Sequence, residues 1–134
     1  RIECGMLSYG SDMTLNDNPY DISLGKFVNL NKKADFLSKN SLQSINNNGL
    51  IKELVGVEII EKISNDFIRD HFPIIDDHKI VGKITSSCYS PRLKKNIGLA
   101  ILESKYKNSK NLKLNYNEKC VGLKVSQLPF IRNK

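Results

Sequence analysis

The chain divides into a first part with weak hydrophobic periodicity and a second part in which apolar and polar residues alternate. From about residue 50 onward, short alternating segments are separated by turn-forming residues, a pattern typical of β-strands. Asp76-Asp77-His78-Lys79 predicts a hairpin-like turn between two of them. Several short strands without a long intervening helix predict a closed or nearly closed antiparallel barrel. The predicted strands are residues 52–61, 72–75, 80–87, 96–102, 112–116 and 120–125.

The first part predicts shorter and more varied elements. Ile2, Met6 and Tyr9 recur at helical spacing and indicate a short opening helix that ends at Gly10. Residues 26–28 are compatible with a short strand. Residues 41–48 predict a short helix, capped by Ser41 or Asn40 and followed by Gly49.

The start of the chain lies inside an element, since no polar leader or cap precedes the first apolar residue. A helix this short is marginal in water without packing partners. We therefore expect the chain to be the C-terminal piece of a longer protein. The expected fold class is mainly β, or α+β overall: a helical and strand-containing tail over residues 1–49, followed by an antiparallel β-barrel over residues 50–134.

Length and composition suit one domain, or one domain plus the tail of another, and they restrict the kinds of partner the chain could bind. With 40% hydrophobic and 26% charged residues, the 134-residue chain can form a core. It has no apolar run near the length of a membrane span. The net charge is +7, but the lysines are scattered, whereas nucleic-acid binding favours arginine and clustered basic stretches. We interpret the loose lysine group as a solvated face rather than a nucleic-acid or anionic surface: Lys105, Lys107, Lys110, Lys113 and Lys119.

The cysteines and histidines give little sign of chemistry. Three widely separated cysteines without a CxxC pair favour reduced thiols and a cytoplasmic protein. We interpret Cys88 as a small buried thiol rather than a nucleophile. His71 and His78 stand near three aspartates, but a metal site needs three or four converging ligands, so a strand pair with an acidic turn is the simpler interpretation. The aspartates are Asp70, Asp76 and Asp77.

Two stretches together resemble a known family. The first is Arg1-Ile2-Glu3-Cys4-Gly5-Met6-Leu7-Ser8-Tyr9-Gly10-Ser11-Asp12, followed by Asn18-Pro19-Tyr20-Asp21 and Lys33-Ala34-Asp35-Phe36-Leu37. The second is Gly82-Lys83-Ile84-Thr85-Ser86-Ser87-Cys88-Tyr89-Ser90-Pro91 with Lys95-Asn96-Ile97, closed by Leu128-Pro129-Phe130. In this order they resemble the C-terminal portion of the tetrahydrofolate-dependent aminomethyltransferases, the glycine cleavage T-protein and its relatives.

Within this family, one motif favours a particular branch. Tyr9-Gly10-Ser11-Asp12-Met13 with Asn18-Pro19-Tyr20 resembles the dimethylsulfoniopropionate demethylase branch more than the glycine cleavage branch. The chain also departs from the family pattern at three positions. Asp21 stands in place of Glu, and Ser38 and Ser87 each stand in place of Gly.

The resemblance implies a three-domain enzyme that binds tetrahydrofolate in a central channel, with a C-terminal barrel packed on the other two domains. Residues 1–49 would be the tail of the folate-binding domain and residues 50–134 the barrel. Arg1 resembles the arginine that meets a folate glutamate carboxylate, a contact that a planar guanidinium can make through two hydrogen bonds. The alternative is a frayed, solvated terminus.

Two further residues belong to this implied cofactor site. Glu3 could orient Arg1 or simply occupy a first helical turn, where negative charge is favourable. Tyr9 is a core residue or a ligand contact. The family's catalytic acid lies in the missing N-terminal part, so no residue here is assigned as catalytic, Asp12 and Asp21 included.

The leading hypothesis is therefore a piece of a folate-dependent methyl or aminomethyl transferase. Its partners would be a small one-carbon donor and the remainder of the parent chain, without nucleic acid, membrane or metal. We expect the isolated chain to be inactive. The alternative is a non-catalytic interaction or docking barrel derived from a T-protein relative.

Overall fold

The computed structural model describes residues 1–61, 71–116 and 118–131. This part of the chain contains one α-helix, α1 (Lys39–Asn48), and six strands. The strands are β1 (Lys52–Ile59), β2 (Pro73–Asp76), β3 (Lys79–Ser90), β4 (Lys95–Glu103), β5 (Lys113–Tyr116) and β6 (Lys119–Ser126). All six predicted strands are present, with ends that differ by a few residues.

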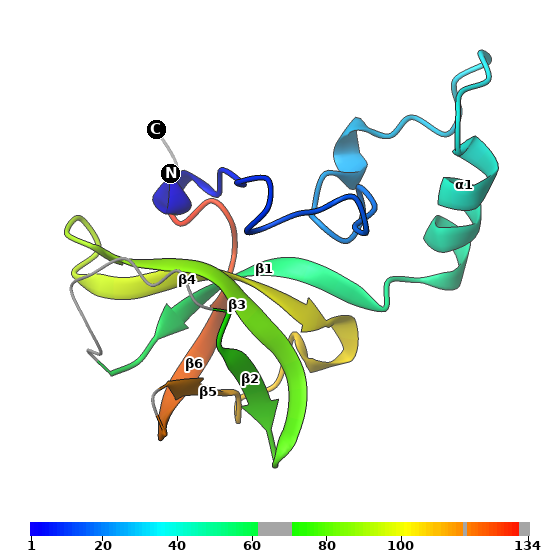
Figure 1. The fold of residues 1–134 in the computed structure, drawn as a ribbon. Helices are drawn as coiled ribbons and strands as arrows, with labels where there is room; N and C mark the ends of the chain where they lie inside the picture. Colours follow the sequence, from blue (N-terminus) through cyan, green and yellow to red (C-terminus); the bar gives the residue numbers. More distant parts are fainter. Residues whose placement is uncertain (62–70, 117, 132–134) are drawn as a thin grey trace.

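The strands form one closed antiparallel barrel in the order β1-β4-β3-β2-β5-β6 (Figure 1). β1 pairs along its whole length with β4 and, from Gly56 to Ile59, with β6, which closes the barrel. The predicted fold class is confirmed. The interior is filled by the inward-facing aliphatic residues of the strands, as alternation requires: Val55, Val57, Ile59, Ile74, Val81, Ile84, Ala100, Leu102, Leu114, Val121 and Leu123, joined by Leu112.

A second apolar cluster lies outside the barrel. Leu54 of β1 and Ile97 and Leu99 of β4 alternate with the interior residues, yet they are at most 3% exposed. Ile2 and the C-terminal residues Leu128 and Phe130 pack on them. Both ends of the described chain therefore lie on one outer face of the barrel, as Figure 1 shows for residues near the N-terminus and the segment after β6.

The start of β1 is covered on the edge that does not pair with β6. β6 does not reach Lys52 to Val55, and there the Leu54 amide donates to the Asp21 carbonyl (2.6 Å), while the Ser23 hydroxyl donates to the Leu54 carbonyl (2.9 Å). Lys52 adds an ion pair with Asp17 at 2.7 Å. The polar segment around residues 17–23 thus protects a strand edge that would otherwise expose its backbone groups.

α1 confirms the predicted helix at residues 41–48 but begins two residues earlier. Ser38 is its N-cap, without a side-chain capping bond, so neither Ser41 nor Asn40 is the cap. None of its residues is buried, and it extends away from the barrel (Figure 1).

Two predictions for the first part are wrong. The opening helix is a single 3₁₀ turn, Ile2–Cys4, because Gly5 takes a left-handed conformation (φ 68°) that ends it at once. Residues 26–28 contain no strand, since Gly25–Phe27 is another 3₁₀ turn. At the first turn, burial on the barrel decides the backbone: Ile2 is 2% exposed, whereas Met6 and Tyr9 of the predicted helical stripe are 61% and 65% exposed.

Candidate functional site

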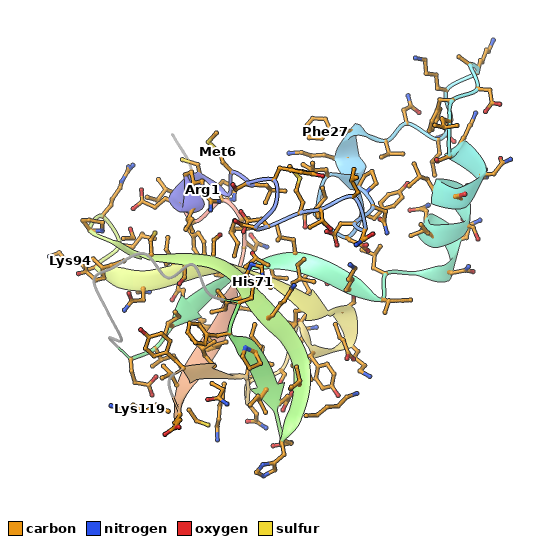
Figure 2. All side chains as sticks on the ribbon, viewed as in Figure 1. Arg1, Met6, Phe27, His71, Lys94 and Lys119 are labelled. Carbon is orange, nitrogen blue, oxygen red and sulfur yellow. The ribbon has the colours of Figure 1, made fainter. Side chains whose placement is uncertain are left out.

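Arg1 is held at the surface of the outer cluster by defined bonds. Its guanidinium Nη1 donates to the Met6 carbonyl at 3.0 Å and to Asp12 Oδ2 at 2.7 Å. The side chain remains 31% exposed. Figure 2 shows Arg1 and Met6 beside each other above the barrel. Arg1 is therefore not a frayed terminus, although part of its side chain is exposed to solvent.

Asp12 is the residue that fixes Arg1, and it is fully buried. Its Oδ1 accepts hydrogen bonds from the hydroxyls of Thr85 and Ser86, both at 2.6 Å, and its Oδ2 also accepts the Ser8 amide at 2.9 Å. Burial alone would raise the pKa of Asp12, but these bonds together with Arg1 lower it below its ordinary value. The carboxylate is therefore charged at neutral pH, with its charge fully compensated by donors.

A bulge in β3 makes this arrangement possible. Side chains of successive residues in a regular strand point to opposite faces. The register between β3 and β4 shifts between Ile84 and Ser86, so Thr85 is an extra residue without a partner in the ladder. Thr85 and Ser86 can then direct both hydroxyls to one carboxylate oxygen.

Glu3 is tied to the barrel as well. Its Oε1 accepts a hydrogen bond from the Ser90 hydroxyl at the end of β3, and its carbonyl accepts the Ile131 amide at 3.2 Å. Burial, and secondly the Glu3 charge, raises the pKa of the nearby Cys88 thiol. Glu3 also occupies the first turn of the 3₁₀ segment, as one of the two sequence alternatives expected.

Tyr9 does not belong to the core. Its exposed fraction of 65% contradicts the core interpretation and places the ring at the surface, in a turn where Tyr9 and Met13 form an isolated bridge. Arg1, Glu3 and Tyr9 thus all belong to the segment that packs on the outer face of the barrel. Arg1 and Glu3 are bonded, whereas Tyr9 is presented to solvent.

Sequence reasoning missed Asp12 as the organising residue of this site. The signal was present, because Asp12 closes the Tyr-Gly-x-Asp motif and Thr85-Ser86 belong to the second motif. The two motifs, 73 and 74 residues apart at their contacts, meet at one carboxylate. Only the fold shows this meeting.

The other sequence candidates remain apart from this site. His71 and His78 are exposed, and Asp70 lies outside the described residues. Among the described residues, no group of three potential ligands could hold a metal ion. Cys4 and Cys120 are exposed free thiols, and Cys88 is half-buried. Of the loose lysine group, Lys105 and Lys107 pair with Glu103 (3.1 Å) and Glu53 (2.8 Å), as a solvated face would.

A second concave region lies at α1. An open groove of about 800 Å³ separates the helix from the start of β1 and from Asn18 and Asp21. Its wall combines Asn and Ser side chains of α1 with Ile45 and Ile51. In the described part of the chain, no helix has the length and apolar character needed to cross a bilayer.

Comparisons with known proteins agree with this architecture. Residues 52–131 match the family described as the glycine cleavage T-protein C-terminal barrel domain. The chain belongs to this family. The T-protein fold is seen in the solved structure of glycine cleavage system aminomethyltransferase T from Bartonella henselae, which superposes with a TM-score of 0.85 at 23% identity. That match covers 98% of this chain and 37% of the other.

Curated relatives extend the match beyond the barrel. Aminomethyltransferases from Bacillus mycoides (strain KBAB4) and from Bacillus cytotoxicus are each 37% identical over 106 residues. The match covers 79% of this chain and 28% of each relative. The chain therefore corresponds to little more than a quarter of the length of these aminomethyltransferases.

Proposed function

We propose that this chain is the C-terminal part of a tetrahydrofolate-dependent transferase, which passes an aminomethyl or methyl group from a small donor to tetrahydrofolate. Membership of the T-protein barrel family and relatives called aminomethyltransferases support this proposal. One observation carries it: the Arg1 guanidinium is held in place by buried Asp12 while 31% of the side chain stays accessible. A cation fixed in this way suits the carboxylate of a folate glutamate.

Each member of the proposed cofactor site has its own part. Arg1 binds a glutamate carboxylate. Tyr9, with its exposed ring, contacts the cofactor beside it. Glu3 supports the site indirectly, since its bond to Ser90 fixes the segment that carries Arg1 on the barrel.

We further propose that residues 1–49 continue the folate-binding domain of a longer parent chain and that residues 50–134 are its barrel. The exposed apolar residues support this division. Leu15, Phe27 and Leu37 are at least 74% exposed and all lie in residues 1–49. Isolated surface apolar residues are ordinary, but this many in one segment indicate a face covered by another part of the protein.

The proposal is tested in the parent protein by replacing Arg1. Arg1→Ala should weaken tetrahydrofolate binding about tenfold or more, because a bidentate charged contact is lost. Binding of 6-methyltetrahydropterin, which has no glutamate tail, should stay unchanged. Arg1→Lys keeps the charge but not the two parallel bonds and should give an intermediate loss. Calorimetry that finds no folate binding by the unaltered parent would contradict the proposal and favour the docking barrel.

The donor is a separate part of the proposal. The named relatives favour an aminomethyl donor, whereas the motif from Tyr9 to Met13 supports dimethylsulfoniopropionate demethylation. Assays of the parent with each donor, following the folate product, distinguish the two. Turnover of only one donor excludes the other branch.

A further inference from the structure

A buried carboxylate connects the proposed folate contact to the barrel. Asp12 is 0% exposed and touches two separate parts of the molecule. Its Oδ1 faces the barrel and accepts the hydroxyls of Thr85 and Ser86. Its Oδ2 faces the N-terminal segment and accepts the Ser8 amide and the Arg1 guanidinium.

The geometry limits how far Arg1 can move. The guanidinium is planar, so a bond to Asp12 Oδ2 at 2.7 Å and one to the Met6 carbonyl at 3.0 Å, both from Nη1, restrict the plane of the whole group. Asp12 itself cannot rotate without losing two hydroxyl donors at 2.6 Å in a buried site. The orientation of Arg1 therefore follows the position of Thr85 and Ser86.

Those two hydroxyls reach one oxygen because of the β3 bulge between Ile84 and Ser86. A bulge is a feature that redirects side chains at a cost in regular pairing. Here the redirected side chains serve the carboxylate that holds Arg1. A continuous chain of contacts thus joins the barrel wall to the partly exposed Arg1 side chain.

We infer that Asp12 is a positioning residue, through which the bulge in β3 sets the orientation of Arg1 for binding a folate carboxylate. This inference rests on the proposed function. It assigns to the barrel a role in cofactor affinity in addition to its own stability. Asp12 acts through Arg1 and does not itself touch the cofactor.

A double-mutant cycle in the parent protein tests the inference. Asp12→Asn keeps the side-chain shape but removes the charge. It should weaken tetrahydrofolate binding about tenfold when Arg1 is present, the equivalent of one charge-assisted hydrogen bond. In an Arg1→Ala background the same change should leave the dissociation constant within about twofold. Equal losses in both backgrounds, or no loss in either, would overturn the inference.

A second variant covers the case in which Asp12→Asn does not fold. Ser86→Ala removes one barrel hydroxyl and keeps the Asp12 charge, so it should weaken binding about threefold, and only when Arg1 is present. Asp17→Asn is the matched control. It removes a carboxylate paired with Lys52 at 2.7 Å and should leave folate binding unchanged.

A measurement without ligand separates this inference from the proposed function. Nitrogen NMR of the guanidinium should show slow rotation and slow hydrogen exchange for Arg1, both lost in Asp12→Asn. If Arg1→Ala leaves folate binding intact, the proposed function fails at Arg1. If Arg1→Ala weakens binding but Asp12→Asn changes neither binding nor the Arg1 signals, the function stands and the positioning role is wrong.

Discussion

Ser86 and Ser87 are neighbours on β3 whose hydroxyls lie in opposite environments. Ser86 donates to Asp12 at 2.6 Å. Ser87 is 1% exposed, and its Oγ has no hydrogen-bond partner among the described residues. Ser87 pairs with Gly98 of β4 in the ladder. The family pattern has Gly at the position of Ser87. A serine hydroxyl therefore stabilises the fold at position 86 and destabilises it at position 87.

Alanine at these two positions should have effects of opposite sign. Ser86→Ala leaves a buried carboxylate short of a donor and should lower the free energy of unfolding by about 2 kcal/mol. Ser87→Ala removes an unsatisfied buried hydroxyl and should raise it by about 1 kcal/mol. Urea denaturation of both variants checks this pair. Destabilisation of similar size at both positions would show that Ser87 has a partner.

The charge of Asp12 predicts an acid-sensitive contribution to stability. Burial alone would raise the pKa of Asp12, but its four hydrogen bonds bring it below the ordinary value. Its contribution is therefore complete above the unfolded pKa of about 3.9 and is lost as the pH falls through the folded pKa. The free energy of unfolding should decrease below about pH 4, and less steeply in Asp12→Asn. Identical pH profiles for the two proteins would show that Asp12 does not contribute to the acid sensitivity.

At the scale of elements, the strands were predictable because side chains alternate between the two faces of a strand. This alternation determines both the sequence pattern and which residues are buried. Alternation places Val55, Val57 and Ile59 inside, and β1 follows it. The N-terminal segment was not predictable in this way. Its spacing fits a helix, but Gly5 and burial of Ile2 against Leu54 and Leu99 produce a 3₁₀ turn instead. Contacts between residues so far apart in sequence leave no local pattern.

One of the positions where the chain departs from the family pattern, Ser38, has a local explanation. Ser38 has φ 67°, a left-handed conformation that glycine adopts without cost. A glycine at this position of the family pattern is thus explained by the left-handed backbone that Ser38 adopts here.

The β2–β3 hairpin contains a similar strained position. Asp77 and His78 join Asp76 to Lys79 with φ of 43° and 69°, the two positive values that a two-residue type I′ turn requires. His78→Gly should therefore raise the free energy of unfolding by about 0.5 to 1 kcal/mol, because glycine is unstrained there. Thermal unfolding measures the change. As a control, Lys83→Gly in the middle of β3 should be destabilising, and a loss of stability in both variants would argue against strain at His78.

For the molecule as a whole, the site depends on segments that meet only in the fold. Arg1 lies at one end of the described chain, Thr85 and Ser86 in its middle, and Leu128 and Phe130 near its other end, yet all belong to one outer face of the barrel. The family resemblance indicated Arg1, Glu3 and Tyr9 as candidates. It could not indicate that the Asp12 carboxylate joins Arg1 to the barrel, since that role is a matter of distance and burial.

The proposed division into a folate-binding tail and a barrel predicts how the isolated chain behaves. Transfer between two bound reactants requires both to be held in one geometry, and this chain spans 28% of the aminomethyltransferases that it matches. The proposed contacts of Arg1 and Tyr9 address only one end of tetrahydrofolate. We therefore expect the purified 134-residue chain to fold as a barrel, with a circular dichroism spectrum dominated by β-structure. It should not turn over an aminomethyl donor or dimethylsulfoniopropionate, and it should bind tetrahydrofolate at least about a hundredfold more weakly than the parent, a loss of about 2.7 kcal/mol. Activity assays and calorimetry on both proteins check these outcomes.

Turnover by the isolated chain would mean that its own residues hold both reactants, and the division into a folate-binding tail and a supporting barrel would then be wrong.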